Sequence, residues 1–200
     1  YFETFNRDNV HLINLKENPI TQISSLSLDA DKTYEIDTLI LATGFDAMTG
    51  ALTSIDITGR DGAKLKDQWE SGAKSYLGLG IANFPNLFTV TGPGSPSVLS
   101  NMMPSIEQHV NWITDCIEWM NANDKKVIES SKTAEDDWMV LVNEIADMTI
   151  FTDTKSWYNG SNIEDKAKAF LPFIGVPVYT EMLEQIVAED YKGFIFDRVN

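Results

Sequence analysis

The sequence predicts an α/β fold in which amphipathic helices pack along a central parallel sheet. Residues 38–42 and 86–91 carry consecutive apolar side chains instead of an alternating pattern, as strands do when both faces of their sheet are covered. A helical period of apolar residues follows the second of these segments. The two covered strands and the helix after them are the observations that indicate a layered architecture.

Before the first covered strand, short apolar runs alternate with polar turns. Residues 10–15, 20–28 and 34–41 each have the length and composition of a strand. The polar break at 29–32 predicts a hairpin between the second and third of these runs.

The helix after residue 91 is expected to open at Met103 and Pro104, with Ser105 and Gln108 spaced as a capping box. It should end near residues 121–124. Trp112 and Trp119 widen its apolar face. The face itself follows the period i, i+4, i+7, i+11, i+14 and consists of Ile106, Val110, Ile113, Ile117 and Met120.

A second helix is expected to begin at Thr133, with Asp136 as its capping partner. The stretch 149–177 has no sustained period and is too long for a plain connection, which is typical of a functional loop. A short helix over 179–189 and an apolar tail over 193–196 complete the chain. The apolar face of the second helix consists of Trp138, Leu141, Val142, Ile145 and Met148.

Composition and charge exclude several classes of partner. Lysine and arginine total 15 against 30 aspartates and glutamates, which gives a formal charge of −15 and disfavours nucleic acid and anionic membranes. No apolar run approaches the roughly 20 residues that span a bilayer. The single cysteine, Cys116, excludes an internal disulfide and a thiolate metal cluster, so we expect no metal site and a cytoplasmic location.

The common self-contained catalytic motifs are absent from the sequence. There is no H-E-x-x-H, no G-x-S-x-G and no G-x-x-x-x-G-K. The two histidines, His11 and His109, are interpreted as surface or core residues. Residues 78–83 begin like a dinucleotide fingerprint, but Asn83 stands where Gly or Ala is needed and no clear strand precedes the segment. The sequence therefore contains no phosphate-binding glycine loop.

The covered strand at 38–42 closes in Thr43 and Gly44, small residues that let the backbone approach a flat ligand closely. An ordinary strand end is the alternative interpretation. Followed by Phe45 and Asp46, the segment is similar to the Ala-Thr-Gly-Phe/Tyr motif of flavin monooxygenases that also bind NADPH. Gly44 is accordingly a candidate cofactor-binding residue.

Three longer segments narrow this resemblance. They are GPGSPSVLSNM at 92–102, SIEQHV at 105–110 and SWYNGSNI at 156–163. In this order and spacing they resemble Baeyer–Villiger monooxygenases of the phenylacetone and cyclohexanone type, and the similarity extends over essentially the whole chain. The chain departs from the family at 164–167, where Glu-Asp-Lys-Ala replaces a typical Pro-Gly-Lys-Pro. The departure predicts that the loop after Trp157 moves or seats a cofactor differently from the family.

The resemblance implies an incomplete α/β fold. Residues 1–125 would form the closing part of a Rossmann-like FAD-binding domain, with the return from the NADP domain near 1–45. Residues 126–200 would form a C-terminal helix and a loop segment that covers cofactor and substrate. In the family, both glycine fingerprints and a peroxide-stabilising arginine precede this region. We therefore expect no catalytic residue in this chain, little activity of the chain alone, and the upstream part of the same enzyme as its partner.

The activity that the resemblance implies requires FAD and NADPH. The family inserts one oxygen atom of O2 into a ketone through a flavin C4a-peroxide and produces an ester or a lactone. Position for position, the backbone of Met102 would contact FAD and Trp157 would contact NADP. Met102 lies just before a helix N-terminus, which stabilises negative charge such as that of reduced flavin. The alternative role for Met102 is simple packing. The alternative role for Trp157 is to close a loop against the core.

The same resemblance implies a ketone pocket with mostly apolar side chains, which suit substrates with few polar groups. A core position is the alternative for each of the two leucines. The residues that match the family's pocket are Ser97, Val98, Leu99 and Leu171.

Two other functions stay open. An N- or S-oxidising flavin monooxygenase shares residues 43–45 but not, as a rule, the segment 92–102, and its products would differ. A non-catalytic truncated module would instead bind a partner chain through an uncovered sheet edge and apolar surface. An authentic start codon before Tyr1 would favour the module.

Overall fold

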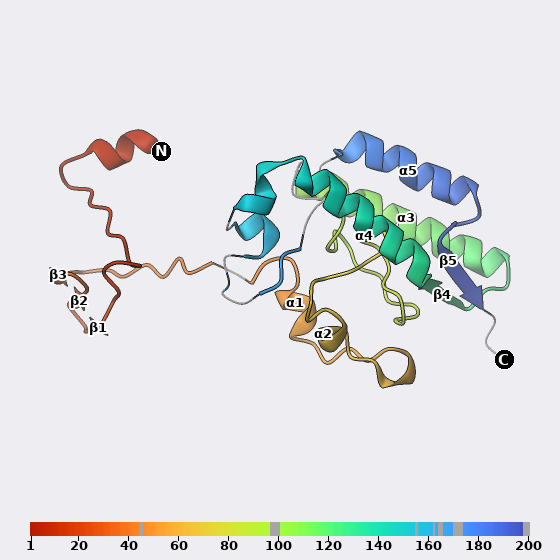
Figure 1. The fold of residues 1–200 in the computed structure, drawn as a ribbon, viewed down its shortest axis with the longest axis horizontal. Helices are drawn as coiled ribbons and strands as arrows, with labels where there is room; N and C mark the ends of the chain where they lie inside the picture. The colour runs from red at the N-terminus through yellow and green to blue at the C-terminus, as the bar shows by residue number, and fades with distance from the viewer. Residues whose placement is uncertain are drawn as a thin grey trace. The chain divides into compact units, whose positions relative to one another are not determined.

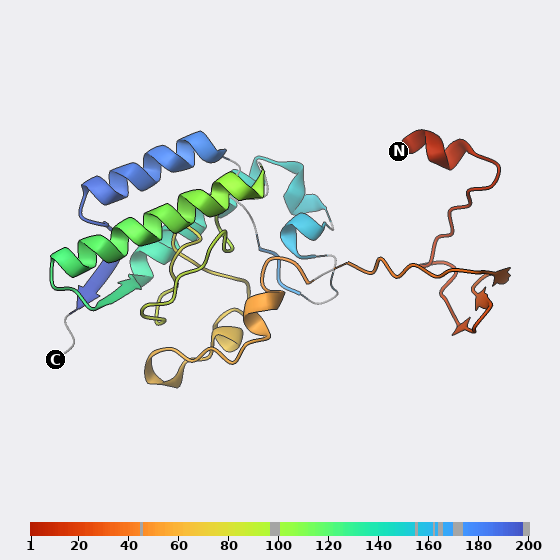
Figure 2. The same ribbon diagram turned by 180° about the vertical axis from the view of Figure 1, so that it is seen from behind.

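The computed structural model describes residues 1–44, 46–96, 101–154, 156–161, 163, 166–169 and 174–197. Its internal contacts divide the chain into two compact units, Tyr1–Gly44 and Phe45–Asn200. We call them the N-terminal unit and the main unit, and each is drawn in Figures 1 and 2. None of the helices among the described residues is long and apolar enough to cross a lipid bilayer.

The N-terminal unit is built around a small antiparallel sheet of order β1-β2-β3. Asp29 pairs with Thr33 across the turn, which confirms the hairpin predicted at 29–32. The prediction of a strand at 10–15 is wrong, because this stretch pairs with no described strand and leads into a turn. The elements of the unit are η1 (Phe2–Asn6), β1 (Gln22–Ile23), β2 (Ser27–Asp29) and β3 (Thr33–Glu35).

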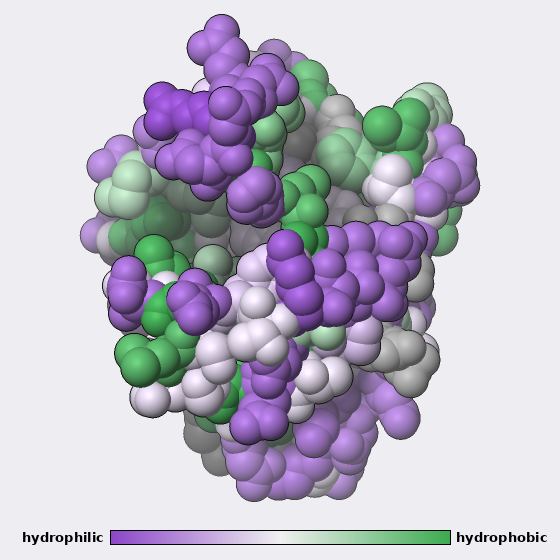
Figure 3. All heavy atoms as spheres, turned by 90° about the vertical axis from the view of Figure 1, so that its left-hand side faces the viewer, coloured by the Kyte–Doolittle hydropathy of each residue, from purple (hydrophilic) through white to green (hydrophobic). Residues whose placement is uncertain are grey.

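Residues 38–44 do not form the buried strand that their apolar run predicts. They are extended but exposed, with Ile40 at 83% and Leu41 at 73% of full exposure. A strand requires a neighbour that supplies hydrogen bonds, and no described residue of the chain pairs with this segment. On the face drawn in Figure 3, apolar side chains in green lie between hydrophilic ones in purple.

The described residues of the main unit form three long helices, a two-stranded sheet and several short turns of helix. The helices α3, α4 and α5 run alongside one another in Figures 1 and 2. Strands β4 and β5 pair antiparallel, with Val127 opposite Asp197. The elements are α1 (Gly50–Thr53), η2 (Arg60–Gly62), α2 (Leu65–Gln68), α3 (Met102–Ala122), β4 (Val127–Ser130), α4 (Lys132–Asp147), η4 (Ile150–Asp153), η5 (Trp157–Asn159), α5 (Val176–Ala188) and β5 (Phe194–Asp197).

The prediction of a second covered strand at 86–91 is also wrong. Its ends turn back through positive φ angles, 57° at Asn86 and 51° at Thr91, and Phe88 makes only an isolated bridge to Gly80. Both sheets among the described residues are antiparallel, so the predicted parallel sheet is absent from them. A short apolar run shows that a segment is buried, but it does not distinguish a strand from a buried turn.

Helix α3 begins earlier than predicted and buries a different face. Asn101 caps it by accepting a hydrogen bond from the Met103 N–H (3.0 Å), in place of the expected Ser105 box. Val110 and Ile117, predicted to face the core, are 46% and 45% exposed. The buried face of α3 is rotated by about one residue relative to the predicted face. It consists of Ser105, His109, Trp112, Cys116 and Met120.

The other helices agree better with their patterns. Ser131 caps α4, where Trp138, Val142 and Ile145 are buried as predicted, whereas Met148 is 78% exposed. Helix α5 begins at Val176, a few residues before the predicted start. Strand β5 coincides with the predicted apolar tail, but its partner β4 was not predicted.

Two clusters of buried side chains stabilise the main unit. The first joins α3, α4, α5 and the turns at 76–79, and therefore includes residues from both sides of position 125. The second joins α1 and α2 with residues near 81–84 and with Ala169. Between the clusters, the buried carboxylate of Glu135 accepts a hydrogen bond from the Ala82 N–H (2.9 Å), and burial raises the pKa of Glu135.

Candidate functional site

The turn at 92–95 precedes the functional segments and is fixed by side chains from elsewhere in the main unit. The Ser75 hydroxyl donates to the Pro93 carbonyl (2.5 Å) and accepts from the Gly78 N–H (3.0 Å). The Trp138 indole N–H donates to the Gly94 carbonyl (3.0 Å). Gly94 has φ +86°, a left-handed conformation that favours glycine. These contacts give the chain a rigid starting point before it enters α3.

Trp138→Phe is expected to lower the free energy of unfolding by about 2 kcal/mol, because the buried Gly94 carbonyl loses its donor. Trp112→Phe is the matched control: Trp112 is similarly buried, at 6% against 4% exposure, but its indole N–H has no partner among the described residues. Urea denaturation should show a clearly smaller loss for Trp112→Phe. Equal losses would contradict the role given to the hydrogen bond.

A buried hydrogen-bond chain connects α3, α5 and the turns at 77–91. The Thr91 N–H donates to His109 Nδ1 (3.0 Å), and His109 Nε2 lies 2.9 Å from the Tyr179 hydroxyl. That hydroxyl donates to the Leu77 carbonyl (2.6 Å). Since Nδ1 accepts, the neutral ring carries its proton on Nε2 and donates it to Tyr179. Of the two interpretations of His109, a surface or a core residue, the structure confirms the core residue.

The titration behaviour of this chain of groups follows from burial. His109 is 1% exposed, and the loss of hydration lowers its pKa to about 4. Burial likewise raises the pKa of Tyr179. Both groups are therefore neutral at physiological pH, and their hydrogen bonds fix the axial and rotational position of α3.

Met102 is the first residue of α3 and is 37% exposed. In the first turn of α3 the Met103 N–H already donates to Asn101 and Pro104 has no N–H, whereas the helix dipole makes this end favourable for negative charge. The preceding candidates Ser97, Val98 and Leu99 lie outside the described residues, and so does Leu171. Their roles stay predictions.

Trp157 begins the short turn η5 and is 44% exposed. Ser156 and Asn159 form a capping box around this turn. Asn159 is 1% exposed, and its amide donates to the carbonyls of Phe151 (2.8 Å) and Thr154 (3.1 Å). A well-anchored turn therefore presents a half-exposed indole. Sequence reasoning missed Asn159, although its Asn-Gly pair is a recognisable turn signal.

Gly44 ends the N-terminal unit with φ +82°, and a methyl group added to it would meet nothing within 4 Å. Its conformation favours glycine, and its contact with a cofactor stays a prediction. Within the main unit, the first turn of α3 and η5 are drawn at the same end of the helical layer (Figures 1 and 2). Backbone N–H groups and an exposed aromatic ring at one end are donors and surfaces that fit a flavin and a dinucleotide.

No family model matches the chain. The chain is 40% identical over 198 residues to the acetone monooxygenase (methyl acetate-forming) of Gordonia sp. (strain TY-5), covering 97% of the chain and 37% of that protein. It is 40% identical over 197 residues to the cyclohexanone 1,2-monooxygenase of Acinetobacter sp., covering 97% and 36%. The chain thus spans little more than a third of these curated relatives.

The solved structures agree. The closed crystal structure of cyclohexanone monooxygenase matches with a TM-score of 0.91 and 39% identity, over 100% of this chain and 38% of that one. An oxidised steroid monooxygenase bound to NADP matches with a TM-score of 0.86 and 40% identity, over 100% and 38%. These structural similarities define the class of protein. The chain has the incomplete α/β fold of a part of a flavin monooxygenase, as predicted.

The relatives narrow this class. Besides the two ketone monooxygenases, one relative that is 37% identical over 99% of the chain carries the name Baeyer–Villiger monooxygenase. Over almost its whole length the chain is therefore similar to a part of Baeyer–Villiger monooxygenases, and it covers 36% to 37% of these three relatives. The resemblance drawn from the segments 92–102, 105–110 and 156–163 is confirmed.

Proposed function

We propose that the chain is part of an FAD- and NADPH-dependent enzyme that inserts one oxygen atom of O2 into a ketone to give an ester or a lactone. The observation that carries the proposal is the 40% identity over 97% of the chain to monooxygenases named for acetone and cyclohexanone. Relatives of known structure are described as complexes with FAD and NADP. When bound, FAD activates oxygen and NADPH supplies the hydride that reduces the flavin.

In this proposal, the chain's own residues bind and orient the cofactors. The backbone at Met102 stabilises the electron-rich side of the flavin, which the position of Met102 as the first residue of α3 supports. Trp157 covers the nicotinamide side and excludes water, which its half-exposed ring on an anchored turn supports. Ser97, Val98, Leu99 and Leu171 are proposed to line the ketone pocket, and Gly44 to approach a cofactor through its backbone.

The proposal includes a division of the complete enzyme. Residues 1–125 would close the FAD domain, with a return from the NADP domain near 1–45, and residues 126–200 would cover the cleft. The exposed apolar side chains of Leu39, Ile40 and Leu41 support a partner strand from another part of the enzyme. A cytoplasmic location, supported by the single cysteine Cys116, is part of the same proposal.

The test is product analysis on the complete reading frame. The purified protein is incubated with NADPH, cyclohexanone or acetone, and ¹⁸O2, and the products are identified by mass spectrometry. We expect ketone-dependent NADPH oxidation and an ester or lactone with one ¹⁸O atom. The 200-residue chain alone should show neither. Tight FAD binding and ketone-dependent turnover by the chain alone would refute its dependence on other sequence.

A second activity is favoured by one comparison. The phenazine N-monooxygenase PhzNO1 of Lysobacter antibioticus is 38% identical over 198 residues and 98% of the chain. The overall similarity of the chain therefore extends to a relative that is named for N-oxidation as well as to relatives named for ketones. The same assay with a phenazine or another aromatic N-heterocycle distinguishes the two, because N-oxidation gives an N-oxide and no ester.

A further inference from the structure

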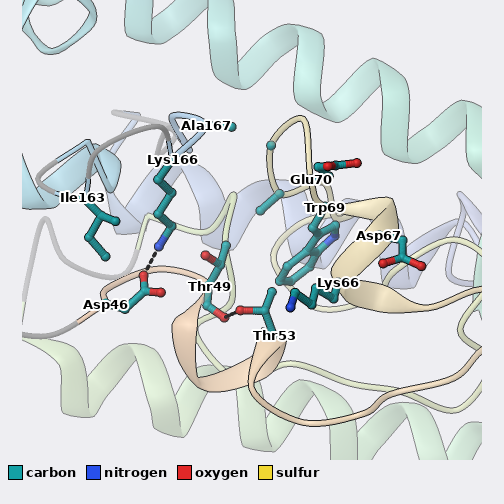
Figure 4. A pocket seen from close by; sticks show the side chains of 12 residues that line it. Asp46, Thr49, Thr53, Lys66, Asp67, Trp69, Glu70, Ile163, Lys166 and Ala167 are labelled. Carbon is teal, nitrogen blue, oxygen red and sulfur yellow. Dashed lines mark hydrogen bonds and ion pairs between the residues drawn. The ribbon is translucent and has the colours of Figure 1, made fainter.

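Lys166 has a side chain that is unusually enclosed for a lysine. The side chain is only 16% exposed, and its ammonium group forms an ion pair with the Asp46 carboxylate (Figure 4). The same ammonium donates to the Ala47 carbonyl (2.8 Å). Lysine is rarely buried without a paired charge, so this arrangement is specific rather than incidental.

The hydrocarbon part of Lys166 lies beside the turn that carries Trp157. Gly160 has no side chain, and a methyl group added to it would lie 3.6 Å from Lys166 Cε. Gly160 is the C-cap of η5, whose first residue is Trp157. The stem of Lys166 therefore lies next to the Trp157 turn, and its head group binds the segment at Asp46.

The surroundings of the ion pair leave it partly shielded from water. Asp46 and Lys166 line one cavity of about 380 Å³, together with Thr49, Lys66 and Trp69 (Figure 4). Three residues after Lys166, Ala169 lies in the second core cluster, and its N–H donates to the Asn159 carbonyl (3.0 Å). The loop after Trp157 is thus anchored by apolar packing at Ala169 and by charge at Lys166.

We propose that Lys166 is a positioning residue: its ion pair with Asp46 and the place of its stem beside Gly160 hold the Trp157 turn against the segment that begins at Asp46. The consequence of this ion pair for the enzyme rests on the proposed function. A turn held in its binding position before NADPH arrives reduces the entropy lost on binding, so the pair favours the dinucleotide without taking part in the chemistry. Lys166 keeps its place here although its neighbours in the sequence depart from the family's Pro-Gly-Lys-Pro.

The direct test is hydrogen–deuterium exchange of the complete protein without nicotinamide. In Asp46→Asn, the amides of residues 156–161 are expected to exchange at least threefold faster, because η5 loses one of its anchors. Asp56→Asn is the matched control, since it neutralises an exposed ion pair with Lys64 (2.8 Å) that does not contact the loop. Unchanged exchange in Asp46→Asn, or an equal increase in Asp56→Asn, would overturn the proposal.

The kinetic test separates positioning from catalysis. Asp46→Asn is expected to raise the KM for NADPH about tenfold and to change kcat less than twofold. The charge-exchanged variant, Asp46→Lys with Lys166→Glu, should return the KM to within threefold of the original and slow the exchange again. A double variant no better than Asp46→Asn would contradict the ion pair as the cause.

The two tests also separate this inference from the proposed function. If the unmodified enzyme does not oxidise NADPH with any ketone, the proposed function fails, and the exchange experiment still decides the role of Lys166. If the enzyme is active and the exchange of residues 156–161 does not respond to Asp46→Asn, only the role of Lys166 fails.

Discussion

His109→Ala is expected to lower the free energy of unfolding by about 3 to 5 kcal/mol at pH 7. The variant leaves the Thr91 N–H without its acceptor and the Tyr179 hydroxyl without its donor, and it opens a cavity where the ring is 1% exposed. Tyr179→Phe removes only the hydroxyl and should cost about 1 to 2 kcal/mol. Urea denaturation monitored by circular dichroism measures both.

The same variant has a defined pH dependence. The pKa of His109 in the folded protein, about 4, lies below the ordinary value of 6.5, so the unfolded state binds the proton more readily. The stability contributed by the neutral ring is complete above pH 6.5 and is lost as the pH falls to about 4. The difference between the original protein and His109→Ala should therefore shrink by roughly 3 kcal/mol over this range. A difference independent of pH would contradict the neutral, buried ring.

Trp157→Ala is expected to raise the Kd for NADP⁺ of the complete enzyme by about 10- to 100-fold, the effect of losing one aromatic contact with a planar ligand. Isothermal titration calorimetry on the FAD-loaded protein measures it without turnover. Tyr158→Phe is the control, because Tyr158 is a neighbouring aromatic of similar exposure, 40% against 44%, and keeps its ring. A Kd within twofold of the original for Trp157→Ala would return Trp157 to a packing role.

The features predicted correctly depend on residues close in sequence. The hairpin at 29–32 follows from a polar break between apolar runs, and most of the buried face of α4 follows from its helical period. The segments 92–102 and 156–163 identified the family because their residue order is itself the signal. In each case the interacting groups lie within one or two turns of chain.

The predictions that failed depend on partners far away in the chain. Residues 38–42 carry the pattern of a covered strand, but no described strand pairs with them. The pattern of a single segment gives no information about whether a partner strand is available. The face of α3 was assigned by counting apolar residues, whereas its orientation is set by His109, whose partners are Thr91 and Tyr179. A histidine on a helix gives no indication of such partners.

The candidate site shows the same division. Met102 and Trp157 were predicted as site residues because their neighbours in sequence carry the resemblance, and their cofactor contacts stay predictions. Asn159 and Lys166 were missed as functional candidates, because their roles arise from contacts that only folding creates, in the case of Lys166 with Asp46, 120 positions away. The sequence indicated the ends of the site, and the structure supplied the contacts that anchor them.

A crystal structure of the complete enzyme with FAD and NADP⁺ bound would show whether Met102 and Trp157 hold the two cofactors. We expect a hydrogen bond of about 3 Å between the Met102 backbone and the flavin, and van der Waals contact between the Trp157 ring and NADP⁺. A flavin bound away from the start of α3, with Trp157 in contact only with protein, would refute both roles.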